Sequence, residues 1–178
     1  MDKRFEDLHF IGNQALLKNY KIAFLCSREV PASIVLKAYD WAIEQREEGR
    51  CVISGFHSKI EKDVFHYLLK GQQPVIMVLA RGFKERLEPE MKPAFDEKRL
   101  LMVSPFDLSV RRITRQTAAK RNEVMFELAD EIFVAYASRG GMLWRLVGEK
   151  IREGKPIFTF DVPENEEMLK DSFKHKFV

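Results

Sequence analysis

Apolar residues along this chain gather in six short runs, separated by longer amphipathic stretches. The runs cover residues 22–26, 51–54, 75–79, 100–103, 132–136 and 157–160. Most of them lack the alternation of apolar and polar residues that marks a half-exposed strand. Continuous apolar runs of this length are typical of parallel strands buried on both faces of a sheet. We therefore predict a mostly parallel sheet of about six strands.

Apolar residues recur at helical spacing in the stretches between these runs. Helices are predicted over residues 32–48, 59–70, 111–129 and 142–153. Glycines follow three of them, where glycine commonly ends a helix. Alternation of strands and helices predicts right-handed crossovers. The expected fold class is α/β, a Rossmann-like three-layer sandwich with a doubly wound sheet.

Three segments fall outside this alternation. Residues 1–20 are predicted as a short helical lead-in, and residues 163–178 as a final helix and tail. Segment 81–99 is polar and contains two prolines. We expect it to form a loop over the ligand-binding edge or a partner contact, because long irregular segments in compact domains are commonly functional. Residues 1–178 are predicted to form one domain.

Small and basic residues follow four of the predicted strands. They are Ser27 and Arg28, then Ser54, Gly55, His57 and Lys59, then Arg81 and Gly82, and finally Ser138, Arg139, Gly140 and Gly141. The carboxyl ends of parallel strands share one edge of the sheet, where ligands bind in open α/β folds. Hydroxyl, backbone N–H and guanidinium groups all bind phosphate. The pattern therefore predicts a phosphate-binding edge.

Two further features of the sequence make the predicted phosphate-binding edge more specific. Ser58 and Glu61 have the spacing of a capping box, which predicts a helix start directly after the second turn. Arg121 and Asn122 lie on the predicted helix 111–129 and would reach the same edge if that helix passes beside it. His57 has no nucleophile to activate, so we expect a binding or structural role for it rather than catalysis.

The absence of two motifs narrows the function. No GxGxxG follows the first strand, and no GxxxxGK[ST] occurs anywhere in the chain. A standard dinucleotide-binding fingerprint and a P-loop ATPase or kinase are therefore both disfavoured. We nominate no catalytic residue, no cofactor and no metal ligand.

Composition adds little beyond this. The 178 residues are 46% hydrophobic and 32% charged, as in an ordinary globular protein, and the net charge is +3. One segment contains five cationic residues and no acidic residue between them. Such a run is often only a solvated helix face, so it indicates an anionic partner only because of its position beside the predicted phosphate-binding edge. The five residues are Arg111, Arg112, Arg115, Lys120 and Arg121.

The two cysteines and the apolar runs bear on localisation. Cys26 and Cys51 are expected at opposite ends of neighbouring strands, too far apart for a disulfide. No run is long enough to span a membrane, and the start lacks the apolar core of a signal peptide. We expect a cytoplasmic protein.

Two long segments resemble the DNA-processing protein A (DprA) family. GRCVISGFHSKIEKDVFHYLLKGQQPVIMVLARGF is similar to that family's SG-x-A-x-GID motif and its following strand. RNEVMFELADEIFVAYASRGGMLWRLVGEKIREGKPIFTFD is similar to its RN segment and SG turn. Ser27 and Arg28 stand where the family has GSR. Cys26 and Lys59 replace glycines of the pattern, and Glu61 replaces its aspartate.

The resemblance implies a Rossmann-like core, related to the lysine-decarboxylase-like nucleotide-binding group. It also implies binding of single-stranded DNA phosphates, in DNA uptake and recombination during natural transformation. The residues carried over by position are Ser27, Arg28, Ser54, Gly55, Arg121, Asn122 and Gly140, with Lys59 as a weaker candidate. The sequence shows neither the helical domain nor the winged-helix domain that flank this core in the family, so recombinase loading is not part of the expectation.

Three functions stay open from the sequence. The first is a module for single-stranded DNA, although few aromatics for base stacking lie near the edge, namely Phe56, Phe83 and Phe106. The second is a small-nucleotide sensor or a degenerate nucleoside-monophosphate hydrolase. Its catalysis would be lost because Arg145 occupies the position at which the lysine-decarboxylase-like hydrolases have their catalytic glutamate. The third uses the fold only for assembly. A homodimer is compatible with all three.

Overall fold

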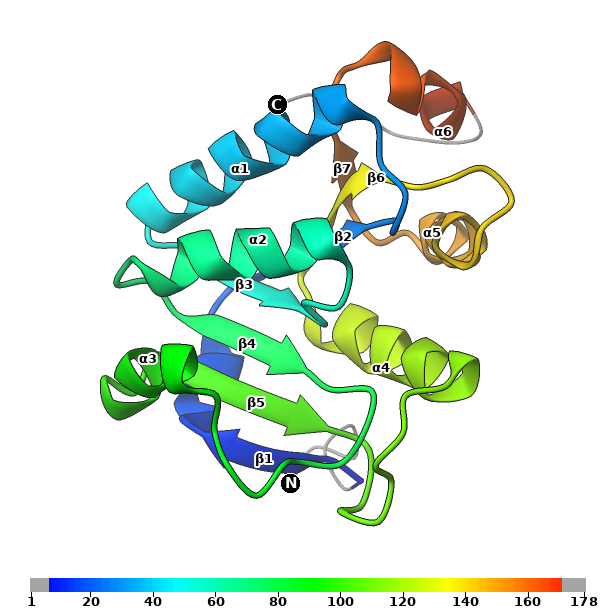
Figure 1. Cartoon of the computed structure of the whole chain (residues 1–178). Coiled ribbons are helices and arrows are strands. Elements are labelled where there is room, and N and C mark those ends of the chain that lie inside the picture. The colour runs from blue at the N-terminus through cyan, green and yellow to red at the C-terminus, as the bar shows by residue number, and fades with distance from the viewer. Residues whose placement is uncertain (1–6, 171–178) are drawn as a thin grey trace.

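A computed structural model describes residues 7–170 of the chain. Its centre is a seven-stranded sheet in the order β1-β5-β4-β3-β2-β6-β7 (Figure 1). The strands are β1 (His9–Gly12), β2 (Lys21–Cys26), β3 (Cys51–Ser54), β4 (Val75–Val78), β5 (Leu100–Ser104), β6 (Glu131–Tyr136) and β7 (Ile157–Thr159). Strands β2 to β7 run parallel to one another, and β1 pairs antiparallel with β5 at the edge of the sheet.

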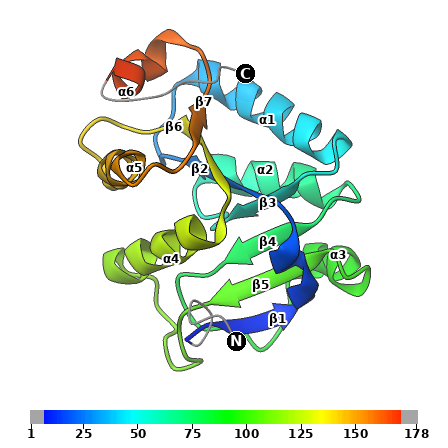
Figure 2. The ribbon, with the colours of Figure 1, turned by 180° about the vertical axis from the view of Figure 1, so that it is seen from behind.

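Helices cover both faces of this sheet. They are α1 (Ala32–Glu47), α2 (Lys59–Leu69), α3 (Lys92–Asp96), α4 (Arg115–Leu128), α5 (Met142–Arg152) and α6 (Glu166–Lys170). The cluster of buried side chains on one face includes residues of α1, α2 and α3, and the cluster on the other includes residues of α4 and α5. Figures 1 and 2 show the two layers from opposite sides. The predicted α/β Rossmann-like sandwich is confirmed.

Strand β2 runs through the middle of the core, and all six of its residues are buried. On one face, Phe24 packs with Trp41 of α1 and Phe133 of β6 in one aromatic cluster, with ring centroids 4.7 and 6.3 Å away. On the other face, Leu25 belongs to the cluster that contains Met125 of α4. Burial on both faces explains why this strand shows no alternation in the sequence.

The prediction of a short helical lead-in over residues 1–20 is wrong at its centre, where the structure has a strand. Residues His9–Gly12 form the edge strand β1, and a short 3-10 helix follows at Gln14–Lys18. Strand β1 is held by pairing with β5, a tertiary contact that its four residues do not signal. Residues 1–6 of that prediction lie outside the described residues.

Two other boundaries differ from the prediction. Helix α4 begins at Arg115 rather than at residue 111, because the Thr114 side chain accepts a hydrogen bond from the Thr117 N–H and ends the preceding loop. Segment 81–99 contains two short helices, Pro89–Met91 and α3. It crosses one face of the sheet, where Met91 and Ala94 join the core.

The structure describes only the first part of the predicted final helix and tail, residues 163–170. A 3-10 turn, Pro163–Asn165, leads into α6, which extends to Lys170. The tail predicted over residues 171–178 lies outside the described residues. Within residues 7–170, no helix combines the length and the hydropathy needed to cross a membrane.

The two cysteines are buried and unpaired, as predicted. Cys51 lies beside Lys21 at the start of β2, whereas Cys26 ends that strand. Burial raises the pKa of both thiols to about 12. Neither cysteine therefore supplies a thiolate at neutral pH.

A buried lysine joins the start of β2 to the start of β6. The Lys21 Nζ donates to the carbonyl oxygens of Leu17 and Asn19 and to the Asp130 carboxylate, which is 2.8 Å away. The Lys21 backbone N–H donates to the same carboxylate oxygen at 2.7 Å. Burial alone would raise the pKa of Asp130, but the hydrogen bonds and charge of Lys21 outweigh it, and the pKa is lowered.

Asp130→Asn should lower the free energy of unfolding by about 1–3 kcal/mol at neutral pH, because the buried Lys21 ammonium loses its counter-charge. The depressed pKa of Asp130 means that this contribution is complete above about pH 4 and is lost as the pH falls through the folded-state pKa. Urea unfolding across this range should show the difference from wild type shrinking in acid. Glu127→Gln, at an exposed position of α4, is the matched control. A difference independent of pH would contradict the assignment.

Candidate phosphate-binding site

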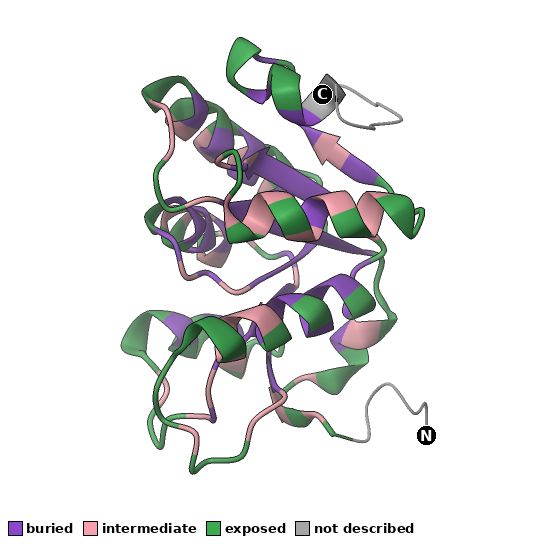
Figure 3. Cartoon of the chain, turned by 90° about the vertical axis from the view of Figure 1, so that its right-hand side faces the viewer, coloured by how far each residue is buried: buried purple, intermediate pink, exposed green. Residues whose placement is uncertain are grey.

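The sheet changes its direction of winding between β2 and β6. The chain leaves β2 through α1 toward β3, and it leaves the neighbouring β6 through α5 toward β7, on the opposite face. A cavity of about 380 Å³ lies where these two strands end. Figure 3 faces the side toward which β4 and β5 point in Figure 1, and it shows buried strand ends among half-buried and exposed loops. This is the place where open α/β sheets bind their ligands.

The buried Glu61 carboxylate organises the first two turns at this edge. Its Oε1 accepts the Cys26 N–H at 3.1 Å, and its Oε2 accepts the N–H groups of His57 and Ser58 at 2.8 and 3.2 Å. The Ser58 hydroxyl in turn accepts the Glu61 N–H, so the predicted capping box is present. One side chain thereby holds the end of β2 against the start of α2.

Arg121 enters the same cavity from α4. Its Nε and Nη2 donate to the Asn122 Oδ1 at 3.0 and 2.8 Å, although the residue is only 7% exposed. The guanidinium lies against Gly55, where a Cβ atom would come within 2.7 Å of it. Gly55 is thus the residue that leaves room for this arginine.

The charge of Arg121 has no close partner within residues 7–170, since no carboxylate there forms an ion pair with it. Burial lowers its pKa, an effect that the charge of Glu61 opposes. A guanidinium remains protonated at neutral pH even so. The cavity therefore holds a buried cation without a direct ion pair among the described residues, and the Glu61 carboxylate of the same cavity acts on it only at longer range.

Arg28 and His57 line the cavity at the ends of β2 and β3. The Arg28 Nη2 lies 3.2 Å from the His57 Nε2, and because a guanidinium only donates, the imidazole accepts. Burial, followed by the charges of Arg121 and Arg28, lowers the pKa of His57. The imidazole is therefore neutral at neutral pH as long as no phosphate is bound beside it.

The third turn joins β6 to α5. The Ser138 N–H donates to the Ser27 hydroxyl at 2.9 Å, which ties this turn to the end of β2. Gly140 adopts a φ of 70°, and Gly141 is the N-cap of α5 without a side-chain cap. Helices α2 and α4, by contrast, are both capped by side chains. The first N–H groups of α5 are accordingly available to an anion.

Helix α4 contributes one face to the cavity. Arg115 and Ala118 line it together with Arg121 and Asn122, at the spacing of successive helical turns. The sequence analysis placed Arg115 in a basic run beside the edge but did not name it among the site residues. Arg115 lies seven residues, or two helical turns, before Asn122 on the same predicted helix, and this spacing was the available signal.

Seven of the predicted site residues line this cavity: Ser27, Arg28, His57, Arg121, Asn122, Ser138 and Gly141. Ser54 and Gly55 do not line the cavity themselves, although Gly55 lies against Arg121, which does. The Ser54 hydroxyl donates to the Phe24 carbonyl and accepts the Phe56 N–H, so its role here is structural.

The remaining predicted residues do not line the cavity. Lys59 is exposed at the start of α2, and Arg139 pairs with Glu167 at 3.1 Å. Gly140 shapes the turn after β6. Arg81 and Gly82 follow β4, where the Gly82 N–H donates to the Val110 carbonyl and holds two loops together.

Solved structures of two DNA processing proteins A share this fold. The Helicobacter pylori protein, whose structure is described for its unique single-stranded DNA binding mode, superposes with a TM-score of 0.77 at 16% identity, over 97% of this chain and 86% of that one. The Streptococcus pneumoniae protein has the same TM-score at 19% identity, over 96% of this chain. This chain spans 62% of the S. pneumoniae chain, less than two thirds of its length.

A more distant relative by fold is the molybdenum cofactor binding protein of Rippkaea orientalis. It superposes with a TM-score of 0.59 at 13% identity, over 86% of this chain and 84% of that one. No curated protein matches the sequence significantly.

The sequence itself matches the family described as DNA recombination-mediator protein A over residues 3–173. The match includes every strand end that forms the cavity. It also agrees with the resemblance drawn from the SG and RN segments. The chain belongs to the DNA recombination-mediator protein A family.

Proposed function

We propose that this chain binds single-stranded DNA, with the backbone phosphates held in the cavity at the ends of β2 and β6, in DNA uptake or recombination. The observation that carries this proposal is Arg121, a buried cation that forms no ion pair with any described carboxylate and that Asn122 orients. Leaving a charge unpaired in a protein interior is unfavourable. A phosphate in the cavity would relieve that penalty through charge-assisted hydrogen bonds.

The surroundings of Arg121 support a polyanion rather than an isolated phosphate. Arg28 and Arg115 line the same cavity, and Arg111 and Arg112 are exposed in the loop that leads into α4. Successive cations of this kind suit successive phosphates of a strand. The family membership and the DNA-binding description of the H. pylori relative agree with this choice.

Base stacking contributes less in this proposal. Phe56 is buried against Phe65 with ring centroids 4.4 Å apart, so the expectation that it stacks on a base is wrong. Phe83 and Phe106 are half-buried and line a different hollow, beside β1. Affinity should therefore depend mainly on phosphate contacts and on salt.

A small nucleotide is the second candidate ligand. The cavity volume of about 380 Å³ lies within the range of small-molecule sites. Arg145, which stands where the hydrolase group has its glutamate, donates to the Gly140 carbonyl at 3.2 Å. A nucleotide would then be sensed rather than hydrolysed. Homodimerisation stays a prediction under either candidate.

Arg121→Ala should weaken binding of a labelled oligo-dT strand about tenfold or more, because a buried charge-assisted contact is lost. It should also reduce the salt slope by about 0.7, the value expected for one phosphate contact to a single strand. Fluorescence anisotropy across a salt series measures both quantities.

Arg152→Ala, at an exposed position in the last turn of α5, is the matched control and should change neither quantity. Unlabelled AMP and GMP serve as competitors. If the wild-type protein does not bind oligo-dT but binds AMP or GMP saturably, the proposal of single-stranded DNA binding is refuted in favour of the small-nucleotide candidate.

Gly55→Ala tests the same contact without removing a charge. The new methyl group would displace the Arg121 guanidinium, which is the far end of a flexible side chain. Binding of oligo-dT should weaken severalfold. Thermal stability should change by no more than about 1 kcal/mol, since the backbone at this position suits alanine. Unaltered affinity with a displaced arginine would remove Arg121 from the site.

Binding should strengthen as the pH falls from about 8 to about 6. Burial and then the charges of Arg121 and Arg28 depress the pKa of His57, and a bound phosphate offsets those charges and so favours protonation of the imidazole. Oligo-dT is the right probe, since its phosphodiesters do not titrate here, whereas a phosphate monoester has a pKa of about 6. His57→Gln keeps an acceptor for Arg28 and should flatten the profile. A profile identical to wild type would exclude His57 as the titrating group.

A further inference from the structure

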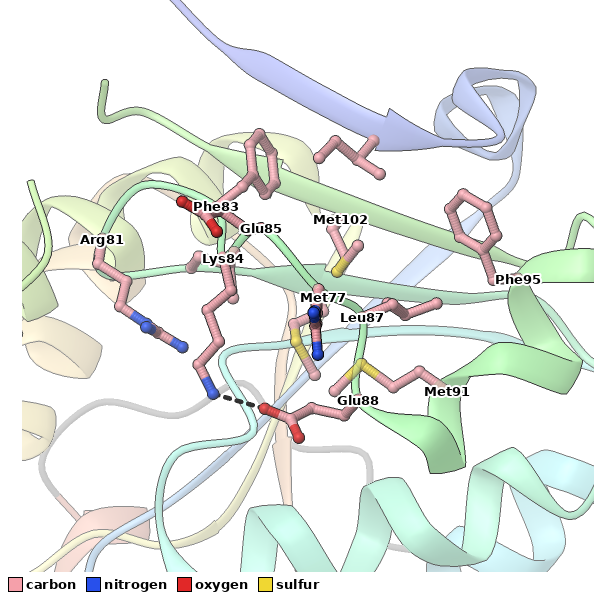
Figure 4. Close-up of a pocket in the computed structure, with 13 residues that line it drawn as sticks. Met77, Arg81, Phe83, Lys84, Glu85, Leu87, Glu88, Met91, Phe95 and Met102 are labelled. Carbon is pink, nitrogen blue, oxygen red and sulfur yellow. Dashed lines mark hydrogen bonds and ion pairs between the residues drawn. The ribbon is translucent and has the colours of Figure 1, made fainter. Parts of the chain in front are cut away.

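A second cavity lies under the connection between β4 and β5 (Figure 4). Its volume is about 260 Å³. In place of a full crossover helix, this connection has an irregular stretch, a 3-10 turn at Pro89–Met91 and the short α3. In Figure 1 it runs from the end of β4 across β5 and β1 to α3. The short helices cover this part of the sheet incompletely, and the cavity is the space that remains.

The floor of this cavity is a row of side chains across three strands. Met77 of β4 pairs in register with Met102 of β5, and Met102 pairs with Ile11 of β1. Residues in register across a sheet lie side by side on one face. All three line the cavity.

The roof comes from the connection itself. It consists of Phe83, Leu87, Met91 and Phe95, which Figure 4 shows around the two methionines of the floor. Three thioethers and two phenyl rings thus surround one space. Methionine sulfur makes favourable contacts with aromatic rings, and its flexible chain adapts to flat shapes. The apolar lining therefore suits a planar ring.

The lining of this cavity also includes three cationic side chains, Arg81, Lys84 and Arg86. Lys84 pairs with Glu88 at 2.5 Å, the contact that is dashed in Figure 4. Arg81 and Arg86 also line the cavity, and within the described part of the chain neither forms an ion pair. Glu85 is the one other acidic residue of the lining. Two guanidinium groups are therefore free to hold an anionic group beside an apolar space.

We infer that this cavity is a second ligand site, which binds a small molecule made of a planar aromatic ring joined to a carboxylate or phosphate. The ring lies among the methionines and phenylalanines, and the anionic group lies against Arg81 and Arg86. The site shares no lining residue with the phosphate-binding cavity. It is therefore independent of the strand-binding proposal, and it gives the protein a means of responding to a free metabolite of this class.

Titration calorimetry and saturation-transfer NMR with three probes test the inference. Indole-3-acetate has both the ring and the charge, indole lacks the charge, and octanoate lacks the ring. Indole-3-acetate should bind saturably at one site, and the other two probes at least fivefold more weakly. No saturable binding of indole-3-acetate, or equal binding of octanoate, would overturn the inference.

Two variants place the binding in this cavity. Leu87→Trp fills the space from the half-buried roof and should abolish binding, whereas Leu36→Trp, on the exposed face of α1, should leave it unchanged. Arg81→Gln should weaken indole-3-acetate about tenfold and leave indole unaffected, which keeps the test decisive if the tryptophan variant misfolds. Undiminished binding in both cavity variants would overturn the assignment.

Arg121→Ala separates this inference from the proposed function. It should leave indole-3-acetate binding intact while strand binding falls. Loss of indole-3-acetate binding in this variant would place the probe in the phosphate-binding cavity and overturn the second site.

Discussion

The phosphate-binding site depends on one constraint of the topology: the crossover connections that follow the adjacent strands β2 and β6 lead in opposite directions along the sheet. Right-handed crossovers that proceed in opposite directions must place α1 and α5 on opposite faces of the sheet. The ends of two adjacent strands are then left without a helix directly over them. The candidate phosphate-binding cavity lies in that gap because no crossover helix covers the two strand ends. Arginine, serine and glycine residues of the surrounding turns line it.

Glu61 determines which backbone N–H groups in this gap are left for a ligand. Buried backbone N–H groups need acceptors, and its carboxylate supplies one for Cys26, His57 and Ser58. An internal anion therefore occupies the amide groups that an external phosphate would otherwise use at the first two turns. What remains for a ligand is the uncapped start of α5 and the arginines of the cavity wall. The family pattern has an aspartate here, and the longer glutamate joins both turns at once.

The sequence predicts those features that local chemistry determines. Buried runs identified the six parallel strands, and the Ser58 capping box was visible in its spacing. Features set by tertiary pairing were not predictable in this way: β1 is a strand because β5 offers it an edge. The same limit applies to the site. Arg81 follows a strand as Arg28 does, but β4 lies two strands from β2, about 10 Å across the sheet. Strand order, which residue type alone does not reveal, separates one phosphate-binding edge into two cavities.

The pairing of Arg121 with Asn122 shows how this fold makes a buried cation tolerable. A guanidinium so enclosed is unfavourable unless it is hydrogen-bonded, and two of its donors are satisfied by the neighbouring amide oxygen. That oxygen is neutral, so it fixes the plane of the guanidinium without neutralising the charge. A carboxylate at position 122 would stabilise the free protein more strongly, but it would compete with any phosphate. The amide orients the arginine and leaves its charge to the ligand, a local loss of stability of the kind expected at a binding site.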